Sequence, residues 1–415
     1  MDILQLTSLL IVLAGVFGSI NYLFLKLPSS IGILIVALFS SLGVMAFDYF
    51  LPVYHSEDRV RALVSEIAFS DALLDGMLGL LLFAGALHVK IADLREQWRV
   101  VFFMATLGVA LSTVVIGFGF SWLTGMPLIV ALVFGALISP TDPVAVLGVL
   151  RGANLPKSLE TKIAGESLFN DGVGYVVFLV LVSLAFPSVD AHATGGKEAA
   201  ILFFQEAGGG ALLGGVLGWL TFRLMRRIDD YALEVLITLG LAFGGYQLSE
   251  FLHVSAPIMA VVAGLLIGDV GMKHGMSEET RQYVKAFWSM IDEILNAVLF
   301  LMIGFEVFAV VFSQSAFISG LGAILLSLLG RFIAVAVPIT MMRPFRSFSS
   351  GAVPIMTWGG LKGGISVALA LSLPDSEYKS LILTCTYMVV VFSIIAQGLS
   401  VARLAKRFAT EPELM

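Results

Sequence analysis

A proline-flanked threonine and aspartate interrupt one of the apolar segments of this sequence. The run SPTDP (residues 139–143) stands in the middle of an apolar segment over residues 127–150. Each proline removes an amide donor and clashes with the preceding turn, so a helix cannot pass through it unperturbed. Freed carbonyls, the Asp142 carboxylate and the Thr141 hydroxyl are hard oxygen ligands, which suit an alkali cation. The alternative is a kinked helix in which Asp142 caps the second half.

A second polar group lies in the next apolar segment, over residues 161–186. Ser167, Asn170 and Asp171 stand at i, i+3 and i+4 and therefore share one helix face, with Glu166 at its edge. Two carboxylates in one apolar segment cannot both face lipid. A carboxylate in a water-filled cavity can hold either a proton or a metal cation, and this competition is the chemistry of exchange. The alternative is a polar packing network between helices.

Two basic residues, Arg331 and Lys362, lie deep inside apolar segments. A cation at the bilayer centre costs roughly 2.5–3.5 kcal/mol, so such residues are functional candidates unless they snorkel to the surface. Lys362 stands among four glycines in the run GGLKGG (residues 359–364), which predicts a second break in a helix. We expect Lys362 to offset the negative carbonyl ends of the half-helices, and Arg331 to pair with Glu166.

The composition places these residues in a membrane protein. Of the 415 residues, 58% are hydrophobic and 13% charged, and the mean hydropathy is +0.98. Soluble domains have about 25% charged residues, so a water-soluble enzyme is excluded. A net charge of −6 argues against nucleic-acid binding. One cysteine and five histidines near polar connections argue against haem, copper and zinc centres, and we expect no cofactor.

Polar and Pro/Gly-rich stretches separate the apolar segments, and this pattern predicts an all-α polytopic protein with about thirteen transmembrane helices. No connection is long enough for a soluble domain, and the first apolar run is interpreted as a retained helix because it lacks a basic leader. The segment over residues 277–292 is interpreted as a helix lying at the membrane surface. The expected spans cover residues 4–25, 29–47, 70–88, 99–122, 127–150, 161–186, 199–226, 231–250, 255–270, 293–313, 316–342, 350–373 and 378–405.

The two broken spans occupy corresponding positions. Each is fifth in a set of six spans, and the sets cover approximately residues 4–186 and 231–405, joined by a linker helix over 199–226. Two such sets separated by one helix must be inverted relative to each other, which is typical of transporters with a site at the membrane midplane. Gly210, Gly214 and Gly218 form a small-residue stripe on the linker helix, where packing between repeats and dimer contact are both open.

The basic residues outside the spans predict the orientation. Eighteen fall on the side of the C-terminus and four (Arg59, Arg61, Lys197 and Lys379) on the other, provided that the number of spans is odd. Because cytoplasmic loops carry the excess of lysine and arginine, the C-terminus is expected in the cytoplasm and the N-terminus outside.

These motifs, in this order and with thirteen spans, resemble the monovalent cation:proton antiporter superfamily, specifically its NhaP/NHE-type sodium/proton antiporters. The resemblance implies a homodimer in the cell (inner) membrane whose protomer, residues 1–415, is one membrane domain without a soluble regulatory domain. It also implies two crossed, unwound helices in a core domain of about residues 99–186 and 316–405. Relatives often have arginine where Lys362 stands, which sets this chain apart from them.

The resemblance also implies the roles of the site residues. The cation would be held by the Asp171 and Asp142 carboxylates, the Ser167 hydroxyl and the Thr141 backbone oxygen. Asn170 would order the site, and a single aspartate beside this asparagine is similar to the electroneutral branch. Glu166 and Arg331 would form a structural ion pair behind the site.

We therefore expect an antiporter, not an enzyme, that exchanges Na⁺, or Li⁺ or K⁺, for H⁺ by alternating access. The alternatives are a K⁺/H⁺ antiporter and a Na⁺-coupled solute symporter with a similar inverted-repeat core, which would need a cavity large enough for an organic substrate. An intramembrane aspartyl protease is disfavoured because its Gly-x-Gly-Asp and Pro-Ala-Leu signatures are absent from the sequence. Glu306 is assigned no role.

Overall fold

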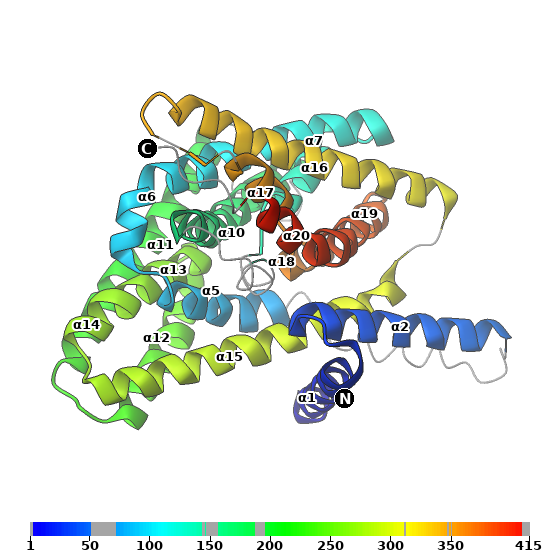
Figure 1. The fold of residues 1–415 in the computed structure, drawn as a ribbon. Coiled ribbons are helices and arrows are strands. Elements are labelled where there is room, and N and C mark those ends of the chain that lie inside the picture. Colours follow the sequence, from blue (N-terminus) through cyan, green and yellow to red (C-terminus); the bar gives the residue numbers. More distant parts are fainter. Residues whose placement is uncertain are drawn as a thin grey trace.

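The computed structural model describes residues 3–50, 72–142, 146, 157–186, 196–310, 313–346, 348–349 and 351–408, and its elements in these ranges are helices (Figure 1). This confirms the expected all-α fold. In the first half of the chain the helices are α1 (Ile3–Ile20), α2 (Ser29–Phe50), α5 (Leu78–Leu87), α6 (Ile91–Phe103), α7 (Val109–Thr124), α8 (Leu128–Ile138) and α10 (Lys157–Ala185).

The second half begins with the long helix α11, which continues the order without strands in the described residues. Its helices are α11 (Gly196–Met225), α12 (Tyr231–Phe251), α13 (Ala256–Leu266), α14 (Met272–His274), α15 (Glu278–Phe305), α16 (Gln314–Met342), α17 (Ala352–Trp358), α18 (Gly364–Leu371), α19 (Lys379–Phe392) and α20 (Gly398–Phe408). π-helical turns cover Asn21–Leu25, Ala72–Met77, Met104–Gly108, Ile267–Gly271 and Ser393–Gln397, and a 3₁₀ turn covers Glu306–Ala309.

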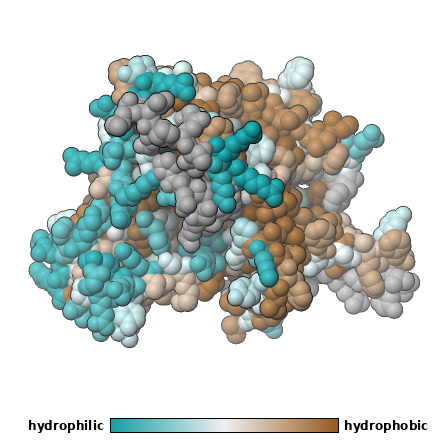
Figure 2. Space-filling view, in the orientation of Figure 1, coloured by the Kyte–Doolittle hydropathy of each residue, from teal (hydrophilic) through white to brown (hydrophobic). Residues whose placement is uncertain are grey.

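Nine helices of the described residues are long and apolar enough to cross a membrane. The apolar helices α5 and α8 are shorter, with 10 and 11 residues. Figure 2 shows broad hydrophobic areas on the outer surface, as expected where side chains face lipid. The count of thirteen spans is compatible with this arrangement and stays a prediction.

The helix expected at the membrane surface over residues 277–292 is continuous with the span that follows it, and its position relative to the membrane stays a prediction. These residues form the first half of α15, which runs uninterrupted across the molecule (Figure 1). Val284 and Trp288 are fully buried, and the Trp288 indole N–H donates to Thr238 Oγ1 at 3.0 Å. The apolar face therefore packs against the protein. No proline stands within α15, and its first glycine is Gly304, so nothing in the sequence breaks the helix earlier.

The glycine stripe of α11 packs against α13 within the same chain. A Cβ atom on Gly214 would lie 2.5 Å from the Met259 carbonyl oxygen, and one on Gly218 would lie 3.3 Å from Ala263 Cα. The absence of side chains thus allows the two helix backbones to approach closely. Of the two alternatives left open by the sequence, the stripe serves packing inside the chain.

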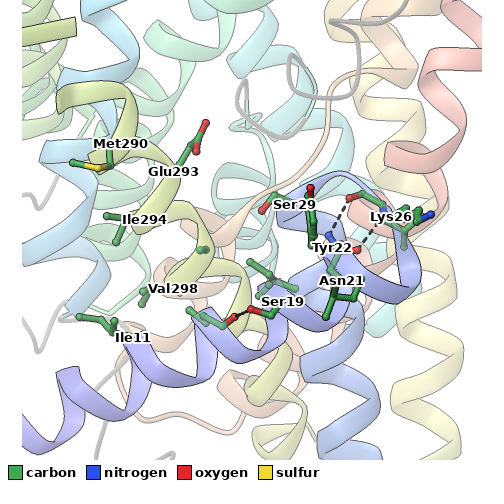
Figure 3. A pocket seen from close by; sticks show the side chains of 17 residues that line it. Ile11, Ser19, Asn21, Tyr22, Lys26, Ser29, Met290, Glu293, Ile294 and Val298 are labelled. Carbon is green, nitrogen blue, oxygen red and sulfur yellow. Dashed lines mark hydrogen bonds between the residues drawn. The ribbon is translucent and has the colours of Figure 1, made fainter. Parts of the chain in front are cut away.

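The connection between α1 and α2 is fixed by one buried amide. The Asn21 side chain donates to the Leu27 carbonyl oxygen at 3.0 Å and accepts from the Leu27 N–H at 3.1 Å. A groove of 1290 Å³ lies beside this turn, between α1 and the middle of α15 (Figure 3). Glu293 of α15 is among the residues that line the groove.

Candidate cation-binding site

The first break in the helices occurs where the prolines predict it. Helix α8 ends at Ile138, and Pro140 to Asp142 are not helical. The rest of the expected segment, residues 143–150, lies outside the described residues except Val146. The Asp142 N–H donates a hydrogen bond of 2.8 Å to the Leu361 carbonyl oxygen, which belongs to the second break.

The second break separates α17 from α18 and covers residues 359–363. The side chains of Ser393 and Gln397 form hydrogen bonds with backbone groups in or next to this break. The Lys362 N–H donates to Ser393 Oγ at 2.9 Å, and the Gln397 amide donates to the Trp358 carbonyl oxygen at 3.0 Å. A Cβ atom on Gly363 would lie 2.7 Å from Asp142 Oδ2, so glycine is required where the two breaks meet.

The two buried cations, Lys362 and Arg331, bind carbonyl oxygens at the ends of different half-helices. Lys362 Nζ donates to the carbonyl oxygens of Ser139 and Pro140, at 3.0 and 3.3 Å, at the end of α8. Arg331 donates to the Met356 carbonyl oxygen of α17 from Nε and Nη2, at 3.1 and 3.0 Å. From the sequence, we expected Lys362 to offset the carbonyl ends of both half-helices. The charges alone do not show which carbonyl oxygens each side chain reaches.

Arg331 also contacts Glu166 through both oxygens of the carboxylate. Nη2 donates to Oε2 at 2.9 Å, and Nη1 donates to Oε1. The exposed fractions of Glu166 and Arg331 are 1% and 5%. The two-point geometry and the extra bonds to Met356 give each buried charge several partners, which a stable buried ion pair requires.

Thr141 joins the first break to α10 through three hydrogen bonds. Its N–H donates to Asn170 Oδ1 at 3.3 Å, and Asn170 Nδ2 donates to its hydroxyl at 2.9 Å. The same hydroxyl lies 2.9 Å from Ser167 Oγ. Asn170 thus bridges the backbone and the side chain of Thr141, and fixes the non-helical segment against α10.

Asp171 lies beside a cavity between the breaks, α5, α10 and α15. Its exposed fraction is 4%, and Oδ1 is buried with no hydrogen-bond partner among the described residues. The cavity has a volume of 50 Å³. The described residues that line it with polar side chains are Thr141, Asp142, Asp171, Asn296 and Ser366, whereas Ser167 and Asn170 are not among its lining residues.

Asn296 of α15 and Ser366 of α18 were not anticipated from the sequence. Neutral polar residues are common in transmembrane helices, so neither carries the signal of a buried charge. Their position on the cavity wall follows from the packing of α15 and α18 against α10, which the sequence does not specify. Glu306 is 5% exposed and begins the 3₁₀ turn after α15, and it is not among the residues that line this cavity.

The sequence model of the family described as "Sodium/hydrogen exchanger, transmembrane" matches residues 5–407. Among curated proteins, the chain is 46% identical to the Na(+)/H(+) antiporter NhaP of Pseudomonas aeruginosa, with 99% of this chain and 98% of that protein covered. It is 37% identical to the Na(+)/H(+) antiporter NhaH of Halobacillus dabanensis, with 92% of each covered.

Among solved structures, the fold is similar to that of the sodium proton antiporter MjNhaP1 from Methanocaldococcus jannaschii. The TM-score is 0.78 with 20% sequence identity, and the alignment covers 99% of this chain and 100% of that one. The similarity in fold extends over the whole membrane domain.

Proposed function

Because the chain belongs to the sodium/hydrogen exchanger family, we propose that it exchanges Na⁺ for H⁺ across a membrane by alternating access, with Asp171 as the exchange carboxylate. The observation that carries this proposal is the buried Asp171 Oδ1, which has no partner among the described residues and borders the 50 Å³ cavity. A buried polar atom without a partner is costly unless a ligand or proton satisfies it.

The size of the cavity supports an inorganic cation as substrate. A space of 50 Å³ accommodates a small inorganic cation with a few water molecules. Pockets for organic ligands have volumes of roughly 300–1,000 Å³. A Na⁺-coupled solute symporter is therefore disfavoured.

The exchange cycle follows from the chemistry of the carboxylate. Deprotonated Asp171 holds the cation together with the Asp142 carboxylate, the Ser167 hydroxyl and the Thr141 backbone oxygen, and it returns across the membrane protonated. Asn170 orders this site through its two bonds to Thr141. Lys362 and the Glu166–Arg331 pair hold the ends of the half-helices in place, so the oxygen ligands need little reorganisation when the cation arrives.

The arrangement of the chain in the membrane forms part of the proposal. The inverted repeats cover about residues 4–186 and 231–405, and the core domain that moves covers about residues 99–186 and 316–405. The excess of basic residues on one side supports a cytoplasmic C-terminus and an external N-terminus in the cell inner membrane. The chain is proposed to function as a homodimer, as its resemblance to the NhaP/NHE type implies.

Reconstitution tests the proposal. Purified protein in liposomes loaded with a pH-sensitive dye should respond to Na⁺, and separate titrations with Li⁺ and K⁺ establish the selectivity. Asp171→Asn should abolish the response, because an amide cannot exchange a proton. The control is Asp229→Asn, the same change at an exposed position between α11 and α12. Na⁺-driven pH changes in Asp171→Asn at the rate of the control would overturn the proposal.

A further inference from the structure

The hydroxyl of Ser366 is buried on the wall of the ion cavity. Ser366 is 1% exposed, and its Oγ has no hydrogen-bond partner among the described residues. A serine inside a helix often bonds the carbonyl four residues earlier. Here that residue is Lys362, which lies in the second break, and Ser366 is the third residue of α18. The helix therefore offers its hydroxyl no such carbonyl.

A second neutral oxygen borders the cavity from α15. Asn296 is 4% exposed, and its Nδ2 donates to the Asp292 carbonyl oxygen at 2.7 Å and to Asp292 Oδ1 at 3.0 Å. Both acceptors lie in the preceding turn of the same helix. Because the amide nitrogen is held there, the carbonyl oxygen occupies the other side of the amide. Asp292 thus decides which end of Asn296 is presented to the cavity.

Most of the other described side chains that line the cavity are apolar. They include Leu78, Leu81, Leu82, Leu168, Leu299 and Ile365. A polar group in such surroundings destabilises the protein unless it has a partner. Hydroxyl and amide oxygens are neutral hard ligands, so they add coordination without changing the charge of the site.

We propose that Ser366 Oγ and the Asn296 side-chain oxygen are further ligands of the transported cation, contributed by α18 and α15, and that Asp292 positions Asn296. This inference rests on the proposed cation exchange and assigns two residues to the same site. Asp171 and Asp142 supply the charge, while Ser366 and Asn296 supply neutral oxygens from the opposite half of the chain. Three parts of the chain, α10 with the first break, α15, and α18, then meet at one ion.

The test combines transport with cation binding at equilibrium. The variants are Ser366→Ala and Asn296→Leu, and the control is Ser112→Ala, which removes another buried hydroxyl without a partner in the described residues, from α7 outside the cavity lining. Binding is measured as the rise in melting temperature with Na⁺ concentration, since a ligand of the folded state at free concentration L stabilises it by RT ln(1 + L/Kd), which gives the Kd for Na⁺. Initial rates of exchange give the KM for Na⁺ and kcat separately.

We expect the KM for Na⁺ and the Kd for Na⁺ from the melting assay to rise about tenfold in Ser366→Ala and in Asn296→Leu, as for loss of one bond to a charged group. Asp292→Ala, which removes the side-chain acceptor of the Asn296 amide, should raise both values as well, whereas Glu293→Ala, the adjacent change on the lining of the groove of Figure 3, should raise neither.

Values for Ser366→Ala and Asn296→Leu within twofold of Ser112→Ala, in variants that melt cooperatively, would overturn the inference. The exchange proposal would survive that result as long as Asp171→Asn is inactive. Conversely, an active Asp171→Asn would overturn the exchange proposal itself, so the two failures are distinguishable. Asn296→Ser, which shortens the side chain but keeps an oxygen, should be less impaired than Asn296→Leu; equal impairment would also count against a ligand role.

Discussion

The backbone N–H of Asp142 donates a hydrogen bond of 2.8 Å to the carbonyl oxygen of Leu361, and this bond ties the two interrupted helices to each other. Non-helical backbone at membrane depth must be satisfied by protein or water. Here the first break supplies an N–H donor to a carbonyl oxygen of the second break that has no helical partner. The donor residue, Asp142, also carries a carboxylate of the candidate site. A change in one break is therefore expected to reach the ion ligands directly.

The contact at Gly363 gives the first prediction. A methyl group at this position would lie 2.7 Å from Asp142 Oδ2, which is closer than real Cβ contacts, so Gly363→Ala must displace the carboxylate or separate the breaks. We expect exchange to fall at least about tenfold, as for misplaced catalytic groups in general. The measurement is the initial rate of Na⁺-driven dye response per mole of reconstituted protein.

The control for this substitution is Gly244→Ala in α12, where a Cβ atom would meet no other atom within 4 Å. Alanine is also the better helix former, so the control should keep its stability. Equal activity of Gly363→Ala and Gly244→Ala would show that the close approach of the two breaks is not needed for transport.

The Glu166–Arg331 pair predicts an asymmetry in stability. Arg331→Ala strands the Glu166 carboxylate and removes both bonds to the Met356 carbonyl oxygen, and loss of one member of a buried pair costs about 3–5 kcal/mol. Glu166→Gln leaves Arg331 its two bonds to Met356 and keeps one acceptor. We expect Arg331→Ala to lower the melting temperature of the purified protein clearly more than Glu166→Gln. The reverse order, or equal melting temperatures, would contradict this account.

The sequence was informative wherever a residue was out of place in an apolar segment. The prolines flanking Thr141 and Asp142 predicted the first break, and the glycines around Lys362 predicted the second; the structure has non-helical backbone at both. Arg331 and Glu166 were expected to pair on charge alone, and the structure brings them together. Helix-breaking residues and charges inside an apolar segment destabilise a membrane protein unless they have partners or a function. Their positions therefore allow a prediction from the sequence alone.

Neutral groups and continuous helices were harder to interpret. Ser366 and Asn296 resemble the polar residues that membrane helices use for packing, and only the tertiary arrangement places them on the cavity wall. The first half of α15 has the charges of a surface helix, and its burial against α5 and α12 depends on neighbours that are distant in the sequence. The division of carbonyls between Lys362 and Arg331 likewise depends on the paths of long side chains.

The proposed competition between proton and cation at Asp171 predicts the pH dependence of transport. A protonated carboxyl does not bind Na⁺, so lowering the pH on the side from which Na⁺ enters should raise the KM for Na⁺. The rise approaches about tenfold per pH unit once the protonated form predominates, as for one competing proton. Rates at saturating Na⁺ should change much less. A KM that is independent of pH between 5 and 8, with a falling maximal rate, would show that the proton acts elsewhere.

The pairing of Asp171 with a neutral Asn170 predicts the stoichiometry. Asn170 is committed to Thr141 through both ends of its amide, and it has no proton to exchange. On the proposed mechanism, the single carboxylate of Asp171 therefore carries either one Na⁺ or one H⁺ per crossing. Exchange is then electroneutral and moves no net charge. In proteoliposomes, collapsing the membrane potential with valinomycin and K⁺ should leave the initial rate unchanged, while an uncoupler that collapses the pH gradient should abolish the dye signal. A rate that follows the imposed potential would require more than one proton per ion. The additional proton would then have to be assigned to a second group, of which the Asp142 carboxylate beside Gly363 is the first to test by substitution with asparagine.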